Sequence, residues 1–277
     1  MIPVAFDYQK VNTIDEAIAA LSNADSKILA GGHSLIPAMK LRLSQPSKLV
    51  DIAGISELKG IREEDGEIVI GAGTTHADII NDGLIKKELS FFAQGASVIG
   101  DIQVRNYGTI GGSLAHADPA ADWPPLVLAA DAAIEVKGKN GSRRIKATDF
   151  FTGLFSTSLQ DDEIITAVRI PVPPNGTKTS YQKFEQPASR FAIVGCAVMR
   201  FADGKTNIAF TGVSHNAFRD NHAEQALSGK ALNEDSIHAA VNAALQHADI
   251  MSDRFASKMY RKHIAKVYLK KALEAVM

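Results

Sequence analysis

Hydrophobic and polar positions near the N-terminus follow a helical period. Thr13 can cap a helix, and Glu16 three residues later completes the capping-box spacing. Apolar residues then recur at i, i+3, i+4 and i+7, at Ile14, Ala17, Ile18 and Leu21. The pattern predicts a helix that begins near residue 14, and short apolar runs predict strands at 27–30, 48–52 and 67–71.

A break in this pattern divides the chain at about residue 175. The segment PVPPNGTKTS, residues 171–180, contains three prolines and a glycine, which cannot continue regular structure. Two apolar runs follow, at 192–201 and 206–213, and the ADGK between them predicts a β-hairpin. The pattern is helical from about residue 220, and the last helix places one face on Tyr260, Ile264, Val267, Tyr268 and Ala272.

Composition narrows the class of protein. Of 277 residues, 45% are hydrophobic and 22% charged, as in soluble globular proteins of one or two domains. Thirty Lys+Arg against 31 Asp+Glu give no global electrostatic reason to bind nucleic acid or an anionic membrane. The single Cys196 excludes a disulfide, a Cys-based zinc site or a Cys-ligated iron–sulfur cluster within this chain. No apolar run has transmembrane length and no signal peptide is visible, so we expect a cytoplasmic protein.

The C-terminal segment is rich in cations. Their spacing is typical of a solvated helix face, and docking to an acidic partner is the alternative. The residues are Arg254, Lys258, Arg261, Lys262, Lys266, Lys270 and Lys271.

A glycine pair follows the predicted strand at 27–30, in the sequence AGGHSL. Glycine permits positive φ and lets backbone N–H groups approach a ligand without a Cβ in the way. A turn from a strand through such a pair into a helix can cradle a phosphate, and Ser34 adds a hydroxyl. A tight turn without a ligand remains the alternative, because neither the GxGxxG nor the P-loop pattern is present.

A second loop, GTIGGSL at 108–114, repeats the design of a glycine pair followed by serine. It lies in a stretch with few charges and many Gly, Ala, Ser and Asn residues, which suits close backbone approach to a flat or anionic ligand. Two such loops, about 80 residues apart, fit a ligand with two phosphates better than either loop fits by itself.

These two motifs carry a resemblance over essentially the whole chain. AGGHSLIPAMKLRLSQPSKLVDI, together with IGDIQVRNYGTIGGSLAHADPAAD, resembles the FAD-binding medium subunits of molybdenum hydroxylases. Carbon monoxide dehydrogenase medium subunits are similar, and the central domain of xanthine dehydrogenase is a more distant relative. The resemblance implies an α+β fold. A two-lobed FAD-binding region of the type shared with vanillyl-alcohol oxidases would span 1–175, divided into 1–54 and 55–175, and a C-terminal domain with a three-stranded sheet and helices would span 176–277.

The resemblance also implies cofactor contacts. The two loops would hold the FAD pyrophosphate, Asp122 would bond the ribityl or adenosine part, Ile165 would line the adenine pocket, and Lys183 would lie near the flavin. The implied loop residues are Ala30, Gly31, Gly32, His33, Ser34, Leu35, Thr109, Ile110, Gly111, Gly112 and Ser113. Carbon monoxide dehydrogenases commonly have a tyrosine at the position of Phe191, and phenylalanine keeps its stacking surface without the hydroxyl.

Other chemistry is less well supported by the sequence. His33, His116 and Asp118 have no Hx₃H or HExxH spacing that would favour a metal site. Asp118 and Asp122 could form an acid–base pair. Pro119 and the Trp-Pro-Pro that follows favour turn and helix-start roles for these two carboxylates.

The implied function is electron transfer rather than substrate chemistry. Such a subunit holds FAD non-covalently and assembles with a small subunit that carries two [2Fe–2S] clusters and a large subunit that carries the molybdenum cofactor, as a dimer of heterotrimers. No residue of this chain would act on the organic substrate. A free-standing flavin oxidase and a non-enzymatic phosphate-ligand binding module are the alternatives.

Overall fold

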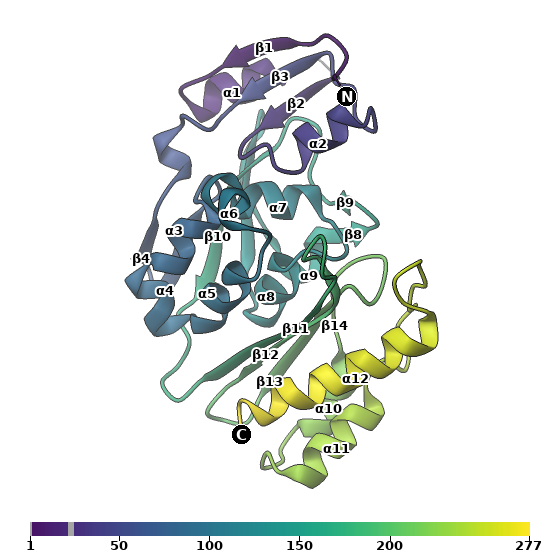
Figure 1. Ribbon diagram of the computed structural model, residues 1–277. Coiled ribbons are helices and arrows are strands. Elements are labelled where there is room, and N and C mark those ends of the chain that lie inside the picture. Colours follow the sequence, from purple (N-terminus) through teal and green to yellow (C-terminus); the bar gives the residue numbers. More distant parts are fainter. Residues whose placement is uncertain (1, 22–24) are drawn as a thin grey trace.

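The chain forms three successive layers that are stacked along its long axis (Figure 1). The computed structural model describes residues 2–21 and 25–277. An N-terminal lobe lies at one end, a five-stranded sheet with its helices in the middle, and a four-stranded sheet with three helices at the other end. A small hairpin of β8 (Phe151–Gly153) and β9 (Ser156–Thr157) lies beside the middle layer.

The N-terminal lobe is a parallel sheet in the order β1-β3-β2, with two helices. Thr13 Oγ1 accepts a hydrogen bond from the Glu16 amide at 3.2 Å, and the Glu16 carboxylate accepts one from the Asn12 amide at 2.8 Å, which confirms the predicted helix start. The elements are β1 (Asp7–Lys10), α1 (Ile14–Ala20), β2 (Ser26–Leu29), α2 (Leu35–Lys40) and β3 (Lys48–Asp51).

The middle layer is an antiparallel sheet in the order β4-β5-β10-β6-β7, and its core lies between the sheet and the helices. Trp123, Phe91, Phe92 and Phe150 are fully buried there. A short 3₁₀ helix (Ser56–Leu58) leads into this layer. Its elements are β4 (Ile61–Glu64), β5 (Glu67–Gly71), α3 (His76–Asn81), α4 (Gly83–Glu88), α5 (Ser90–Ser97), α6 (Ile102–Tyr107), α7 (Ile110–His116), α8 (Trp123–Ala129), β6 (Ala133–Gly138), β7 (Gly141–Lys146), α9 (Ala147–Phe150) and β10 (Ile164–Pro171).

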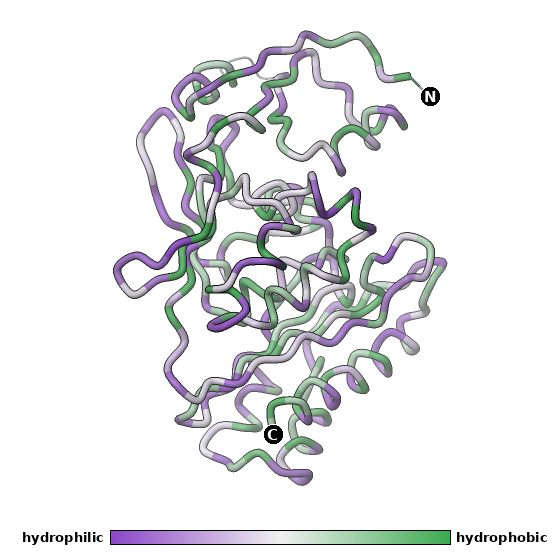
Figure 2. The backbone as a smooth tube through the Cα atoms, turned by 60° about the vertical axis from the view of Figure 1, so that its left-hand side comes forward, coloured by the Kyte–Doolittle hydropathy of each residue, from purple (hydrophilic) through white to green (hydrophobic). Residues whose placement is uncertain are grey.

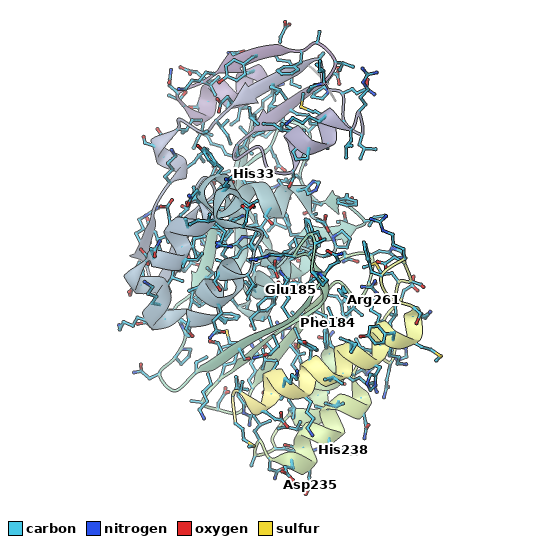
Figure 3. All side chains as sticks on the ribbon, viewed as in Figure 1. His33, Phe184, Glu185, Asp235, His238 and Arg261 are labelled. Carbon is cyan, nitrogen blue, oxygen red and sulfur yellow. The ribbon has the colours of Figure 1, made fainter. Side chains whose placement is uncertain are left out.

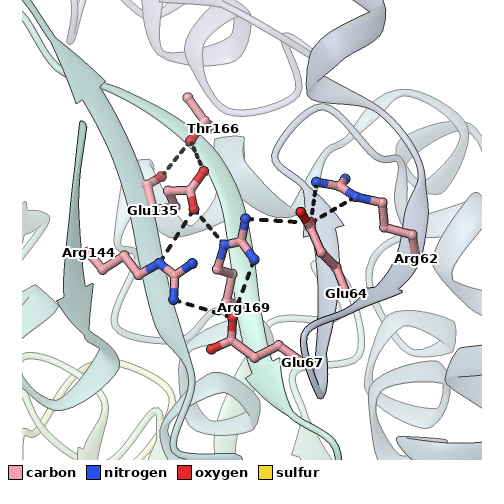
Figure 4. Close-up of polar contacts among 7 residues, drawn as sticks. All are labelled: Arg62, Glu64, Glu67, Glu135, Arg144, Thr166 and Arg169. Carbon is pink, nitrogen blue, oxygen red and sulfur yellow. Dashed lines mark hydrogen bonds and ion pairs between the residues drawn. The ribbon is translucent and has the colours of Figure 1, made fainter. Parts of the chain in front are cut away.

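Charged side chains form a network across the strands of the middle sheet (Figure 4). Arg169 is only 8% exposed, and its guanidinium lies 2.5 Å from Glu135, 3.3 Å from Glu67 and 3.7 Å from Glu64. Arg144 contacts Glu67 and Glu135 as well, at 3.3 and 3.6 Å. The nearly buried guanidinium is therefore compensated by carboxylates from three other strands of the sheet, β4, β5 and β6, as a buried charge requires.

The C-terminal layer is an antiparallel sheet in the order β11-β12-β13-β14. The three-stranded expectation was wrong by one strand, because β14 has only two residues and so short a strand leaves no period in the sequence. The predicted hairpin is confirmed by the pairing of β12 with β13. The elements are β11 (Lys178–Glu185), β12 (Ala192–Arg200), β13 (Thr206–Thr211), β14 (Phe218–Arg219), α10 (Asn221–Leu227), α11 (Glu234–Ala243) and α12 (Lys258–Glu274).

Strand β12 is apolar on both sides because both faces of this sheet are covered. Val194, Cys196 and Val198 pack in a core with the C-terminal helices, whereas Ala197 and Met199 belong to the core of the middle layer. A strand buried on both faces is a continuous hydrophobic run rather than an alternating one. The expectation that Cys196 is a buried small hydrophobe is confirmed, since it is 0% exposed.

The buried face of α12 differs in part from the predicted one. Hydrophilic and hydrophobic residues alternate along this helix (Figure 2), but Tyr260 is 44% exposed. The buried residues are Arg261, Ala265, Leu269, Ala272 and Leu273. The predicted face is therefore confirmed in part, because Ala272 is buried and Ile264 and Tyr268 pack against the core of the C-terminal layer. The prediction missed Arg261, since a pattern based on hydrophobicity excludes arginine from the core.

Candidate functional site

The first glycine loop lies where the N-terminal lobe meets the middle layer, and His33 marks this place in Figure 3. It connects β2 to α2. No amide from Gly31 to Leu35 donates a hydrogen bond to another residue within 2–21 or 25–277. Gly32 has φ +73°, the left-handed conformation that glycine tolerates best. Successive N–H groups in such a turn form a concave site for an anion.

The second glycine loop docks directly against the first. A Cβ added to Gly31 would lie 2.1 Å from the carbonyl oxygen of Tyr107, and one added to Gly112 would lie 3.9 Å from the Cβ of Ala30. On its other side the second loop rests on the sheet, since a Cβ on Gly111 would lie 2.6 Å from the Cβ of Ala72. The structure therefore brings together two loops that are about 80 residues apart in sequence.

The two loops differ in their free donors. In the second loop, the amide of Ile110 donates to Thr74 O at 3.2 Å, that of Gly111 to Ala72 O at 2.9 Å, and that of Gly112 to Thr109 Oγ1 at 3.1 Å. Neither Gly111 nor Gly112 has positive φ, because both lie in the first turn of α7. Free amides are therefore concentrated in the first loop, and the second loop supplies a close-fitting backbone surface.

His76 is hydrogen-bonded to the second glycine loop through its backbone. Its amide donates to Gly108 O at 3.0 Å, and its Nδ1 accepts a hydrogen bond from Trp123 Nε1 at 3.1 Å. Burial, with smaller effects of His33 and Arg105, lowers the pKa of His76 to about 4. The imidazole is therefore neutral at pH 7, as its acceptor role at Nδ1 requires.

We expect His76 to make folding sensitive to mild acid. Its pKa falls from 6.5 to about 4 on folding, so its contribution to stability is present above pH 6.5 and is lost as the pH falls toward 4. The loss is about 3 kcal/mol in the free energy of unfolding. Urea unfolding at pH 7.5 and pH 4.5 measures how much of the free energy of unfolding is lost in acid. This loss should be smaller in His76→Asn than in the unmodified chain. It should be unchanged in His238→Asn, an exposed control. Equal acid losses in His76→Asn and the unmodified chain would contradict the assignment.

Asp122 and Lys183 form a buried ion pair. Lys183 Nζ lies 2.8 Å from Asp122 Oδ2 and also donates to Val98 O at 3.0 Å, and the two side chains are 4% and 5% exposed. Tyr181 donates its hydroxyl to Asp122 Oδ1 at 2.6 Å. Burial raises the pKa of Asp122 to about 6, although Lys183 and Tyr181 oppose the shift. Both carboxylate oxygens therefore have protein partners, which suits Asp122 to hold Lys183 in place.

The other residues singled out from the sequence are scattered around the two loops. Ile165 is 5% exposed in the core of the middle layer, and Phe191 is 44% exposed beside the start of β12. Asp118 Oδ1 accepts a hydrogen bond from the Ala120 amide at 2.8 Å, as a turn residue does. Within the described residues no hydrogen bond or ion pair joins the Asp122–Lys183 pair to the glycine loops, and no three His, Cys, Asp or Glu side chains form a possible metal site.

Sequence reasoning missed His76 and Tyr181. Both are buried polar side chains whose partners lie 47 and 59 residues away, at Trp123 and Asp122. No local pattern marks such a contact. The one available signal is that a polar residue within a hydrophobic stretch needs a hydrogen-bond partner when it is buried.

Comparison with known proteins defines the class. The family described as FAD binding domain in molybdopterin dehydrogenase matches residues 4–173, and the one described as CO dehydrogenase flavoprotein C-terminal domain matches residues 179–276. None of the helices in the described ranges has the length and hydrophobicity needed to cross a bilayer. The chain is thus composed of an FAD-binding domain followed by a flavoprotein C-terminal domain.

Full-length relatives identify the family more closely. The carbon monoxide dehydrogenase medium chain of Hydrogenophaga pseudoflava is 39% identical, over 99% of this chain and 98% of its own. The glyceraldehyde dehydrogenase medium chain of Sulfolobus acidocaldarius is 34% identical, over 100% of both. The solved carbon monoxide dehydrogenase from H. pseudoflava matches with a TM-score of 0.96 and 40% identity, over 100% of this chain and 98% of that one. The chain belongs to the family of FAD-binding medium subunits of molybdenum hydroxylases.

Proposed function

We propose that this chain holds one FAD non-covalently and is the electron-transfer subunit of a molybdenum-containing dehydrogenase. Electrons from substrate oxidation at the molybdenum cofactor of a large subunit would arrive through the [2Fe–2S] clusters of a small subunit and leave to an external acceptor. The complex would be a dimer of such heterotrimers. The observation that carries the proposal is the run of free amides from Gly31 to Leu35, closed by the second glycine loop.

Residues around the junction of the two loops fit this cofactor. In this proposal the amides of the first loop bind the pyrophosphate oxygens, with the Ser34 hydroxyl as a further donor. The backbone of the second loop forms the surface against which the cofactor packs. Ile165 contributes apolar surface for the adenine, and Asp122 holds Lys183 near the flavin. The assigned residues are Ala30, Gly31, Gly32, His33, Ser34, Leu35, Thr109, Ile110, Gly111, Gly112, Ser113, Asp122, Ile165 and Lys183.

In this proposal FAD carries out the electron transfer, and the chain binds and orients the FAD. FAD accepts two electrons and releases them one or two at a time, which links one-electron carriers to a two-electron acceptor. Cys196 is buried and its pKa is raised by burial, so this chain has no thiolate to offer a cluster. The clusters must therefore be held by a partner chain.

The test uses the assembled complex purified from its source. We expect acid precipitation to release all of the flavin into the supernatant, and metal analysis to find iron and molybdenum with the co-purifying chains. The complex that carries Gly31→Ala should still show cluster reduction by substrate, but it should not reduce the acceptor.

Two results would overturn the proposal. Substrate turnover by the isolated, FAD-loaded chain without iron or molybdenum would support a free-standing flavin oxidase. Absence of flavin from the complex, together with failure of added FAD to bind, would support a phosphate-ligand binding module.

A further inference from the structure

Arg261 is a buried cation that the helical pattern places among solvated ones. It lies near the start of α12, at the end of the C-terminal sheet (Figure 3). The residue is 1% exposed, whereas its neighbour Lys262 is exposed. A buried guanidinium is retained only where partners satisfy it, so the contacts of Arg261 define what it holds.

The guanidinium joins three segments. Its Nη1 donates to Ile193 O at 2.6 Å and to Gly212 O at 2.5 Å, and its Nη2 lies 2.7 Å from Asp253 Oδ2. The first two carbonyls belong to β12 and to the residue that follows β13. Gly212 has φ +74°, and a Cβ there would lie 2.7 Å from Ile193 O. The start of β12 and the end of β13 therefore lie close together, and Arg261 donates hydrogen bonds to a carbonyl from each of them.

The same strand ends hold the segment between α7 and α8. The amide of Gly212 donates to Pro119 O at 2.7 Å. The Thr211 hydroxyl lies 2.8 Å from both Pro119 O and Ala121 O, and its single proton can be donated to either carbonyl. The amide of Ala192 donates to Ala120 O at 3.2 Å. Residues 119–121 are thus held by the C-terminal layer, in addition to their local hydrogen bonds with Asp118.

This segment connects two parts of the assigned FAD site. On one side it follows α7, whose first turn is the second glycine loop, and on the other side it leads directly into Asp122, which holds Lys183. A shift of the segment therefore moves both parts relative to the first loop.

We propose that Arg261 is a positioning residue for the FAD site, acting through the ends of β12 and β13 on residues 119–121. The inference rests on the proposed FAD function. It makes α12, the last helix of the chain, part of what determines FAD affinity, although Arg261 itself does not contact the assigned loops. Loss of the guanidinium removes the donor from one buried carbonyl, Gly212 O, and from one partly buried carbonyl, Ile193 O. A site that is displaced by a fraction of an ångström loses affinity.

The experiment compares the buried Arg261 with Arg219, a partly buried arginine of the same layer. Arg261→Met removes the proposed contact. Arg219→Met is the matched control, since Arg219 pairs with Glu224 and Asp131 and, in the described ranges, makes no hydrogen bond to residues 119–121. Asp253→Asn is a milder second variant, because it weakens the hold on the guanidinium and leaves Arg261 in place. Amide exchange of Gly212 and Ala192, the FAD dissociation constant and the midpoint of thermal unfolding are measured for each.

We expect Arg261→Met to raise the FAD dissociation constant about tenfold or more, with faster exchange of the Gly212 and Ala192 amides. Arg219→Met should lower the unfolding midpoint without either change. If Arg261→Met does not fold, Asp253→Asn should show the same two changes to a smaller extent. Unchanged FAD affinity in the folded Arg261 or Asp253 variant overturns the inference, whereas failure of the unmodified chain to bind FAD overturns the proposed function instead.

Discussion

Replacing Gly31 with alanine is expected to weaken FAD binding strongly while the chain remains folded. The added Cβ would lie 2.1 Å from Tyr107 O and 2.8 Å from the Cα of Gly108, so the first loop must move away from the second. The amides from Gly31 to Leu35 would then no longer converge on one anion. Loss of two charge-assisted hydrogen bonds, about 1.5–3 kcal/mol each, weakens binding by a factor of about a hundred or more.

Gly83→Ala is the control outside the site. A Cβ added to Gly83 would have no atom within 4 Å, and this exposed glycine begins α4 without positive φ. We expect this variant to keep its FAD. Circular dichroism establishes folding, and FAD per chain and calorimetric titration establish affinity. Full FAD occupancy in folded Gly31→Ala would show that the docking of the two loops does not form the pyrophosphate site.

Replacing Lys183 with methionine is expected to destabilise the chain by about 3 kcal/mol at pH 8, because a buried carboxylate loses its cation. Asp122 binds its proton more tightly in the folded chain, with a pKa of about 6 against 3.8, so its contribution to stability falls as the pH rises through this range. Without Lys183 the pKa of Asp122 rises further. The deficit of the variant should therefore be smallest near pH 4 and grow as the pH rises above 6.

Urea unfolding across this pH range measures the effect. Adding Asp122→Asn to Lys183→Met should recover much of the lost stability, because the pair is then replaced by neutral groups. Lys205→Met removes an exposed ion pair with Asp131 and should cost less than about 1 kcal/mol. A Lys183→Met deficit that does not change with pH would mean that lost packing, and not the charge of Asp122, causes the destabilisation.

Local features of this protein follow from the sequence with little help from tertiary structure. The Thr13 cap, the hairpin at ADGK and the strand that begins at Glu67 all appear where the pattern predicts them. Each depends on hydrogen bonds and steric limits among residues that are close in the chain, so the sequence alone contains the necessary information. The family resemblance carried by the two glycine motifs is likewise confirmed by the family matches over residues 4–173 and 179–276.

Tertiary structure decided which of these groups remain available for chemistry. The sequence treats the two glycine loops as equivalent, but Thr74 and Ala72 take up the amides of the second loop and leave those of the first loop free. The sequence likewise treats Arg261 as one of seven solvated cations. In the fold it is buried, and it donates hydrogen bonds to the carbonyls of Ile193 and Gly212, which lie 68 and 49 residues away in the chain. Whether a donor or a charge is free depends on which distant backbone the fold brings to it, and no local pattern carries that information.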